Sequence, residues 1–516
     1  MITRGAKYRW AAGGGIAAIL IASRLFLAPK YLYHFDSVNF ALALTDFDPL
    51  EHQPQPPGYP LFVVLSRVIY WLVSSPQMAL VLTGILGSLA GMFLVWRLGR
   101  DMFGDRAGLC AALLLLFHPA FWFSGLTNQV RVLLVAGTAA TMLAVWRSLS
   151  RDFVNPYWFY LAAASAGFFA GFRPMEMLFL VPLIVWSGVR ARRPARQWLT
   201  AAAIFAVSVL SWLSALFIAV NGPARYLALV RQYADTQFSP TSLAWGSAAE
   251  PAKGMLTAAL VWYTVPLLSW IWAAPFVWRR LGRLKEAGGL LVLSLVPAFL
   301  FHAFIHVGDP DHTLTGVPAL CVLGGFVLSR LDRARVAAVA TAVAVNALLF
   351  FSPPAGIASK CAYSVVQDMD RVTRSTFQAI ERIGPAQPLV LVALDHPVSW
   401  RHLLFYFPEI PVIILHGDPA SANPQRPWII RHRKRRELEL EADRIPLPAG
   451  AKVVWLLARG RGLERLLGNE GRIVTQRDLL YSEPPDGLKF RFGSYLFNVA
   501  RTPEILKEAS YTPAGE

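Results

Sequence analysis

Long apolar runs separated by short polar segments fill the chain up to about residue 352. A run of roughly 17 to 25 apolar residues can cross a bilayer as a single helix. By this measure we expect eleven transmembrane helices. They lie near residues 11–29, 76–96, 108–124, 128–146, 157–172, 174–189, 198–219, 255–277, 288–305, 313–329 and 334–352. The predicted architecture of residues 1–352 is therefore a polytopic α-helical membrane domain.

Beyond Pro354 the pattern changes to short β-type runs between turn-forming residues. The expected strands are Leu389–Leu394, Val412–Leu415, Val453–Leu457 and Leu488–Val499, and the expected helices are Tyr363–Ile383 and Trp400–Phe407. Residues 353–516 are therefore predicted to form a soluble α/β domain. The basic run Arg431–Arg436 within it is typical of a solvated helix face, and its functional alternative is contact with anionic lipid headgroups.

Composition excludes a soluble globule. Of the 516 residues, 55% are hydrophobic and only 16% are charged, and the mean hydropathy is +0.44. This apolar content also excludes an intrinsically disordered chain. With three cysteines, two of them inside apolar runs, no disulfide framework is expected.

The net charge of +17 is distributed as in a membrane protein, and we expect no nucleic-acid partner. Of the 27 basic residues before residue 353, 19 lie in the N-terminal segment and in alternate loops between the predicted helices. Loops rich in Lys and Arg stay in the cytoplasm. We therefore expect a multi-pass protein of a cell membrane, the inner membrane of a bacterium, with a cytoplasmic N-terminus and an extracytoplasmic C-terminal domain.

The first outer loop, residues 30–75, carries candidate chemistry. Asp36 follows the first predicted span and is flanked by aromatic residues. A carboxylate that is partly desolvated there gains basicity and can accept a proton from a hydroxyl group. The alternative is that Asp36 only caps a helix over Ser37–Leu44, since Asp is a favoured N-cap.

The same loop continues into a proline-rich stretch, Pro54–Pro60. Proline cannot donate a backbone hydrogen bond, so we expect an extended, stiff segment. The following run Leu61–Val73 contains Arg67 and aromatic residues near its end, which favours a helix at the membrane surface over a twelfth span.

These motifs resemble the GT-C superfamily of membrane glycosyltransferases, and most closely its protein O-mannosyltransferase-like branch. The resemblance rests on Asp36-Ser37 after the first span and on His-x-Pro-x-Pro-Pro-Gly-Tyr-Pro-Leu-Phe from His52 to Phe62. Three further stretches agree in order along residues 1–352. They are Pro119-Ala120-Phe121-Trp122 leading into Asn128-Gln129-Val130, then Gly171-Phe172-Arg173-Pro174, and finally Gly308-Asp309-Pro310-Asp311 before Val317-Pro318-Ala319.

The resemblance implies a transferase that takes a sugar from a polyprenyl-phosphate carrier in the membrane. The sugar passes, with inversion, to a protein, glycolipid or polysaccharide acceptor on the outer side. Asp36 would be the catalytic base, and His52 and Tyr59 of the shared motif would bind substrate. Where members of the branch tend to carry Ala-Glu near the fourth span, this chain has Asn128 and Gln129, so that acidic position is absent.

The donor phosphate needs cations at the outer face, and Arg131 and Arg173 stand at the ends of apolar runs there. An ionisable residue at membrane depth is a functional candidate by default. The alternatives are that each arginine reaches toward the interface or pairs with Glu176.

A histidine-rich segment runs from His302 to His312 and includes Asp309 and Asp311. His302 and His306 are spaced to share one helix face, which can bind a metal. No third ligand is fixed by the pattern, so a divalent cation stays one option, beside hydrogen bonding of the donor phosphate or simple residence at the interface. Asp309 and His312 are the candidate substrate-binding residues of this segment.

The alternative function is a polytopic transporter or lipid flippase, because many spans and buried arginines serve those proteins as well. Transporters tend to show inverted repeats with interrupted helices near the midplane. No internal repeat stands out in this sequence, and its ionisable residues gather toward one face. Both features favour the transferase.

Overall fold

The computed structural model describes residues 4–150, 155–277, 284–383 and 398–410, together with strands β1 to β11 of the C-terminal part. Contacts divide the chain into two units. The helical unit comprises Met1–Pro29 and Asn39–Val366, and the second unit comprises Lys30–Val38 and Gln367–Glu516. The segment Lys30–Val38 thus groups with the C-terminal part, and the division after Val366 lies later than the predicted boundary after Ser352.

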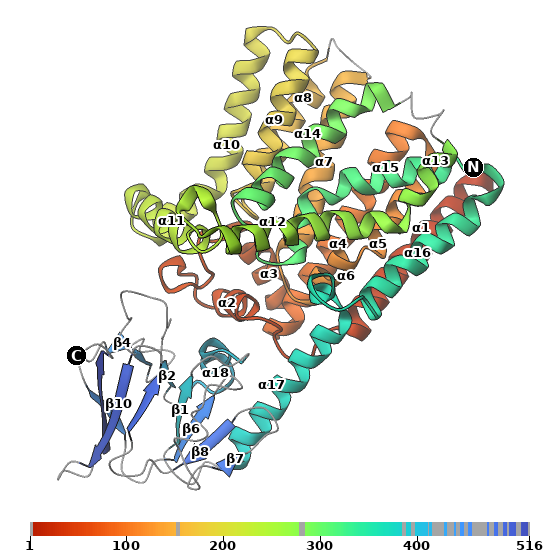
Figure 1. Ribbon diagram of the computed structural model, residues 1–516. Coiled ribbons are helices and arrows are strands. Elements are labelled where there is room, and N and C mark those ends of the chain that lie inside the picture. The colour runs from red at the N-terminus through yellow and green to blue at the C-terminus, as the bar shows by residue number, and fades with distance from the viewer. Residues whose placement is uncertain are drawn as a thin grey trace. The chain divides into compact units, whose positions relative to one another are not determined.

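Helices account for most of the described chain (Figure 1). In chain order they are α1 (Arg4–Leu27), α2 (Phe35–Ala43), α3 (Pro60–Val73), α4 (Pro76–Phe103), α5 (Asp105–Leu116), α6 (Pro119–Leu126), α7 (Arg131–Ser150), α8 (Tyr157–Phe169), α9 (Glu176–Arg190), α10 (Ala195–Ala219), α11 (Pro223–Phe238), α12 (Ala249–Thr264), α13 (Ala274–Val277), α14 (Lys285–Phe304), α15 (Val317–Ser329), α16 (Arg335–Phe351), α17 (Tyr363–Ile383) and α18 (Trp400–Tyr406). Short 3₁₀ helices include η1 (Pro49–Glu51), η3 (Val265–Ser269), η4 (Ile271–Ala273) and η6 (Pro310–Thr315).

Each predicted span falls on one or more of these helices, and the polytopic helical fold is confirmed. Within the described residues, five helices are long and apolar enough to cross a membrane by themselves, or up to seven if each of two bent pairs is one span. Among the other predicted spans, α8, α9 and α15 have 13, 15 and 13 residues and are shorter than a bilayer requires. Eleven crossings therefore stay a prediction.

In each of the two bent pairs a proline stands at the bend or shortly before it. The predicted span 108–124 is α5 and α6, which meet at 55°, and Pro119 begins α6. The predicted span 255–277 is bent by 55° after Ser269, and Pro266 stands at the start of η3. Proline has no backbone N–H to donate, so helices end or kink there.

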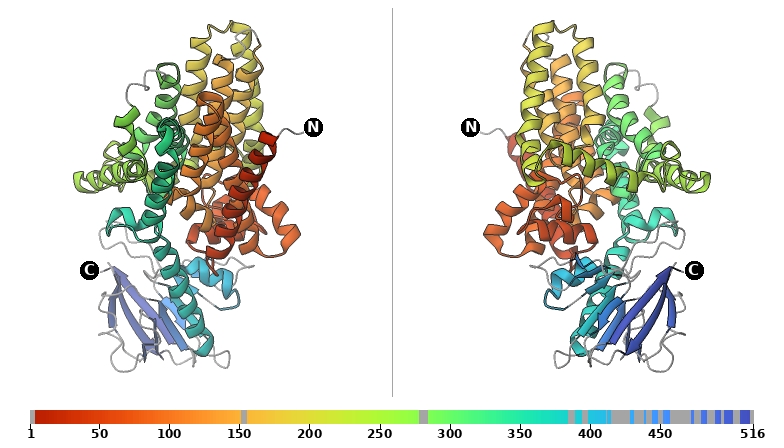
Figure 2. Two further views of the ribbon diagram at one scale, coloured as in Figure 1. Left: turned by 90° about the vertical axis from the view of Figure 1, so that its right-hand side faces the viewer. Right: turned by 90° about the vertical axis from the view of Figure 1, so that its left-hand side faces the viewer.

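The core of the helical unit lies among α4, α5, α7 and α15. Small residues let these helices approach closely. A Cβ on Gly108 of α5 would lie 2.5 Å from the carbonyl oxygen of Trp96 in α4, and a Cβ on Gly325 of α15 would lie 2.5 Å from that of Ala107 in α5. Helices α8, α9 and α10 pack beside this core as neighbouring rods (Figure 2). Such contacts are typical of helix packing in membranes.

The second unit contains two sheets. The larger has the strand order β4-β3-β2-β1-β6-β8-β7, in which β1 (Leu389–Ala393) pairs in parallel with β2 and β6. The smaller is antiparallel, in the order β5-β11-β10-β9. The remaining strands are β2 (Val412–Ile414), β3 (Trp428–Ile430), β4 (Leu438–Glu439), β5 (Arg444–Leu447), β6 (Lys452–Leu456), β7 (Arg472–Ile473), β8 (Leu479–Ser482), β9 (Lys489–Phe492), β10 (Tyr495–Arg501) and β11 (Lys507–Pro513).

The α/β character of this unit agrees with the sequence, with one correction. The single strand predicted over Leu488–Val499 is two antiparallel strands, β9 and β10, in which Tyr495 is the partner of Phe492. Gly493 and Ser494 separate them in the sequence, and residues of these types favour turns over strand continuation. The basic run Arg431–Arg436 lies outside the described residues.

Candidate functional site

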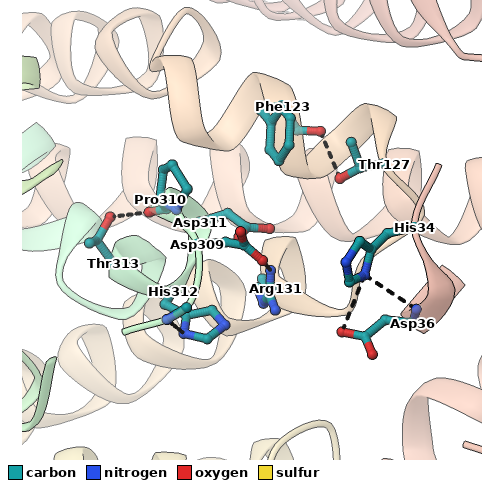
Figure 3. A network of polar contacts seen from close by, with 11 residues as sticks. His34, Asp36, Phe123, Thr127, Arg131, Asp309, Pro310, Asp311, His312 and Thr313 are labelled. Carbon is teal, nitrogen blue, oxygen red and sulfur yellow. Dashed lines mark hydrogen bonds and ion pairs between the residues drawn. The ribbon is translucent and has the colours of Figure 1, made fainter. Parts of the chain in front are cut away.

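Asp36 lies in the first turn of α2, which begins one residue earlier at Phe35. It is therefore not the N-cap, and the predicted helix start at Ser37 was wrong. The Asp36 backbone N–H donates to His34 Nδ1 at 3.3 Å, and the same nitrogen lies 3.9 Å from Asp36 Oδ2 (Figure 3). The Asp36 side chain is 15% exposed. A shielded carboxylate that still reaches solvent suits the predicted base.

The proline-rich stretch is folded into turns, so the predicted extended conformation was wrong. Asp48 and Gln53 form an isolated antiparallel bridge, and the Gly58 N–H donates to the Gln55 carbonyl at 3.0 Å. The proline ring sets φ near −65°, which tight turns use as readily as extended chain does. The helix predicted after this stretch is present as α3, and its exposed side carries Val64, Val68, Trp71 and Leu72.

His52 and Tyr59 stand at two bends of this loop. Both have left-handed backbone conformations, with φ of 58° and 46°. The His52 ring lies 6.1 Å from the ring of Tyr233 in α11, while the buried Tyr59 packs edge-on against Phe40 at 5.3 Å. Helix α11 also holds the loop through Tyr226, whose hydroxyl donates to the Pro57 carbonyl at 3.0 Å. His52 thus contacts α11, whereas Tyr59 contacts Phe40 of α2.

Arg131, the first residue of α7, pairs with the two carboxylates of the Gly-Asp-Pro-Asp motif. Its Nη1 lies 2.5 Å from Asp311 Oδ1 and 3.5 Å from Asp309 Oδ2 (Figure 3). The Asp311 side chain is fully buried, whereas that of Asp309 is 48% exposed. The alternatives of a pair with Glu176 or a side chain reaching toward the interface do not describe Arg131. Its charge is already balanced by a buried partner.

Three histidines gather beside this pair. His312 lies next to the rings of His306 and His302, at 5.6 and 6.3 Å, and its Nδ1 accepts the Gly308 N–H at 3.2 Å. Burial, reinforced by the positive charges of Arg173 and Arg131, lowers the pKa of His306 to about 4. The same causes lower the pKa of His312 well below its usual value. At neutral pH both imidazoles are therefore uncharged.

The metal alternative gains no support from this geometry. His302 Nδ1 is 3.0 Å from the hydroxyl oxygen of Tyr263. In the part of the chain that the structure describes, no group of three or more His, Cys, Asp or Glu side chains is arranged to hold a metal ion.

Arg173 differs from Arg131. It lies between α8 and α9 with 8% of its surface exposed, and it makes no hydrogen bond or ion pair with any described residue. The predicted alternative, a pair with Glu176, is not observed, although the two charges interact. Glu176 Oε1 instead accepts from Thr315 Oγ1 at 2.7 Å. Arg173 is thus a buried cation whose positive field reaches all three histidines.

Asn128 and Gln129, at the position where the resembling branch carries Ala-Glu, are buried. Asn128 has a left-handed backbone, with φ of 61°, and its Nδ2 donates to Gln77 Oε1 at 3.2 Å. The Asn128 amide therefore makes a hydrogen bond between side chains at this position and carries no charge.

The helical unit thus brings Arg131, Arg173, Asp309 and His312 into one cluster, while His52 lies against Tyr233 of α11 and Tyr59 against Phe40 of α2. The sequence did not single out Asp311 as a site residue or Tyr263 as a partner of His302. A second carboxylate two residues from Asp309 was a visible signal. Tyr263 gave none, because it stands inside an apolar run.

Comparison with known proteins finds a related sequence family and a shared fold. In sequence, residues 54–215 match the family model of dolichyl-phosphate-mannose-protein mannosyltransferases. The matched segment contains Tyr59, Arg131 and Arg173. No curated protein matches the chain.

Solved structures of ArnT share the fold at low identity. ArnT from Cupriavidus metallidurans bound to undecaprenyl phosphate is 14% identical, with a TM-score of 0.60, over 93% of this chain and 100% of ArnT. Its apo state matches with a TM-score of 0.59. The oligosaccharyltransferase of Archaeoglobus fulgidus is 12% identical, with a TM-score of 0.44, over 77% of this chain and 63% of its own. The chain is a multi-pass membrane protein of ArnT-like fold, and its resemblance to the GT-C, mannosyltransferase-like proteins is confirmed.

Proposed function

We propose that the chain is an inverting membrane glycosyltransferase that takes a sugar from a polyprenyl-phosphate donor. It passes the sugar to a protein, glycolipid or polysaccharide acceptor on the outer side of the membrane. The observation that carries this proposal is the Arg173 side chain, which is 8% exposed and has no hydrogen-bond or ion-pair partner among the described residues. The segment that matches the mannosyltransferase family contains it.

A buried cation without a partner is costly, so an anionic ligand would stabilise it. Guanidinium matches the geometry of a phosphate, and the neutral histidines His306 and His312 add hydrogen-bond donors without charge. ArnT, whose fold the chain shares, has been solved with undecaprenyl phosphate bound. These points support a lipid phosphate as the leaving group. The polyprenyl tail of this lipid would lie among the surrounding membrane lipids.

The reaction is a single displacement. Asp36 accepts the proton of the acceptor hydroxyl, whose oxygen attacks the anomeric carbon. The bond from that carbon to the phosphate oxygen breaks on the opposite face, which inverts the configuration. The lipid phosphate leaves with the bonding electron pair, and a positive group such as Arg173 stabilises its growing charge. The reaction thus requires a group that accepts the proton and a cation that stabilises the leaving phosphate.

The proposal is tested by incubating membranes that contain the protein with radiolabelled polyprenyl-phosphate sugars of several kinds. A transferase consumes label from one lipid pool and produces a labelled acceptor. Label that crosses the bilayer while the sugar stays attached to its lipid would instead identify a flippase and overturn the proposal.

The role of Asp36 is tested by Asp36→Asn, which keeps the shape of the side chain but cannot accept a proton. We expect the transfer rate to fall by roughly 10²- to 10⁴-fold, because positioned proton transfer is lost. A stabilising role in the first turn of α2 would cost only about 1 kcal/mol. Initial rates at saturating donor separate these outcomes.

Asp46→Asn in the same loop is the matched control and should stay within a few-fold of the parent. If Asp36→Asn also retains a rate within a few-fold while inserting normally, Asp36 is not the base. Asp46, Asp48 and Glu51 would then be tested in turn.

A further inference from the structure

The residues just before Asp36 are held by side chains from the C-terminal part of the chain. The backbone N–H groups of Lys30 and Tyr31 both donate to Asp370 Oδ1, at 2.8 and 3.1 Å. Asp370 lies on α17, and its other oxygen accepts from Arg374 Nη2 at 3.1 Å, one helical turn later. The carboxylate is therefore oriented from one side and binds two successive amides on the other.

Leu32 is held at both of its backbone polar groups by α18. Its N–H donates to the Tyr406 hydroxyl oxygen at 3.0 Å, and its carbonyl lies 3.1 Å from His402 Nε2. The Ser399 N–H donates to His402 Nδ1 at 3.3 Å. Nδ1 is thus an acceptor, and the ring proton on Nε2 donates to Leu32. Leu32 and His402 are both fully buried.

Side-chain packing also holds the segment Lys30–Leu32 in place. The Tyr31 ring meets Phe377 and Tyr406 edge-on, at 5.2 and 5.7 Å, and packs against a small core built from α17, α18 and β2. Burial raises the pKa of Tyr406 to about 12, so its hydroxyl stays neutral at pH 7. Three consecutive residues are thus fixed through their amides, one carbonyl and one aromatic side chain.

The segment fixed in this way leads within four residues to Asp36. The Val38 N–H donates to the His34 carbonyl at 3.2 Å, so α2 starts almost as soon as the held segment ends. Contacts place all of Lys30–Val38 in the unit that contains α18 and α17 from Gln367 onward. A shift of Leu32 would therefore be passed to Asp36 through a short stretch of chain.

We propose that Asp370, His402 and Tyr406 are positioning residues for Asp36, so that the C-terminal domain sets the place of the catalytic base. The inference rests on the proposed function, because it takes Asp36 to be the base. It gives α17 and α18 of the C-terminal domain a role in the transfer reaction. A displacement of about 1 Å in a catalytic group can cost about a hundredfold in rate.

The hydrogen bonds from Lys30 and Tyr31 to Asp370 are tested by hydrogen exchange on the full-length protein, which does not depend on activity. In Asp370→Ala, peptides that span residues 30–31 should exchange about tenfold to hundredfold faster, because a bond to a charged acceptor is lost. The control is Asp368→Ala, on the same helix, whose exposed carboxylate pairs with Arg371. Unchanged exchange in Asp370→Ala would overturn the proposal.

The consequence for catalysis is tested by steady-state kinetics. Tyr406→Phe keeps the ring and removes only the acceptor of the Leu32 amide, so it is the variant least expected to disturb folding. We expect it and Asp370→Ala to lower kcat by about tenfold to hundredfold, with the KM for the polyprenyl-phosphate sugar unchanged. A normal kcat in both variants, or a rise in KM alone, would overturn the proposal.

A double variant separates this proposal from the assignment of the base. If Asp370 acts through Asp36, adding Asp370→Ala to Asp36→Asn lowers the rate no further. Multiplied losses would show that Asp370 acts elsewhere, and would overturn the positioning role while leaving Asp36 as base. An active Asp36→Asn variant would instead show that Asp36 is not the base. Hydrogen exchange would still show whether Asp370 holds the amides of Lys30 and Tyr31.

Discussion

At the scale of single residues, the two candidate arginines have different surroundings. The sequence placed both at the ends of apolar runs as ligands of the donor phosphate. In the structure Arg131 is paired with the buried Asp311, 2.5 Å away, whereas Arg173 has no hydrogen bond or ion pair with the described residues. Arg173 is therefore the better candidate for the phosphate, and Arg131 supports the fold around it.

This difference predicts distinct effects of the same substitution. Arg173→Gln should raise the donor KM by about tenfold to hundredfold, since a charge-assisted bond to phosphate is worth about 1.5 to 3 kcal/mol. The thermal stability of the protein without donor should hardly change. Arg173→Lys, which keeps the charge but loses the planar fork, should recover part of the affinity. Donor titration of the initial rate measures both.

Arg131→Gln should instead destabilise the fold by about 3 to 5 kcal/mol, because it leaves the Asp311 carboxylate buried and unpaired. Thermal unfolding in detergent measures this loss. The double variant Arg131→Gln with Asp311→Asn should recover much of the stability. A stable Arg131→Gln with a raised donor KM would contradict the assignment and place the phosphate on Arg131.

At the scale of helices, the packing of the core depends on residues without side chains. Gly325 of α15 sits where any Cβ would lie 2.5 Å from the Ala107 carbonyl oxygen and 2.7 Å from the Ala111 amide nitrogen. These are backbone atoms of α5, which cannot rotate away. Close approach of this kind provides the van der Waals contact that holds helices together in lipid.

Gly325→Ala should therefore force α5 and α15 apart and destabilise the protein by about 1 to 3 kcal/mol. Gly254→Ala in α12 is the matched control, because its added Cβ would meet nothing within 4 Å. There alanine should be neutral or stabilising by about 0.5 to 1 kcal/mol. Thermal unfolding of the two variants in the same detergent makes the comparison, and equal melting temperatures would refute the close contact.

At the scale of the whole molecule, the proposed reaction depends on orientation. Asp36, the proposed base, and the domain that begins at Gln367 must lie on the same side of the membrane. Contacts place Lys30–Val38, which contains Asp36, in one unit with that domain. The bias of Lys and Arg toward alternate loops predicts which side this is, because basic loops remain in the cytoplasm.

A reporter enzyme that is active only outside the cytoplasm should therefore be active when fused after Glu516 and inactive when fused after Arg196. A reporter active only in the cytoplasm should give the reverse pattern. If the fusion after Glu516 proves cytoplasmic, the transfer reaction cannot take place on the outer side.

The sequence by itself determined what depends on local pattern. Hydrophobic runs predicted the helices, since each helix needs its own apolar surface, and charge bias predicted an orientation. Residue types predicted α17, α18 and three strands of the C-terminal domain. The lengths of unbroken helix, and hence the number of candidate spans, needed the structure.

The tertiary structure alone decided which distant side chains meet. Arg131 and Asp311 are 180 residues apart in sequence, and the Lys30 amide and Asp370 are 340 apart. No periodicity encodes such a pair, because it forms only when the packing of every intervening helix brings the two residues together. For the same reason the sequence could propose Asp36 as a base, but not the α17 and α18 side chains that hold the chain leading to it.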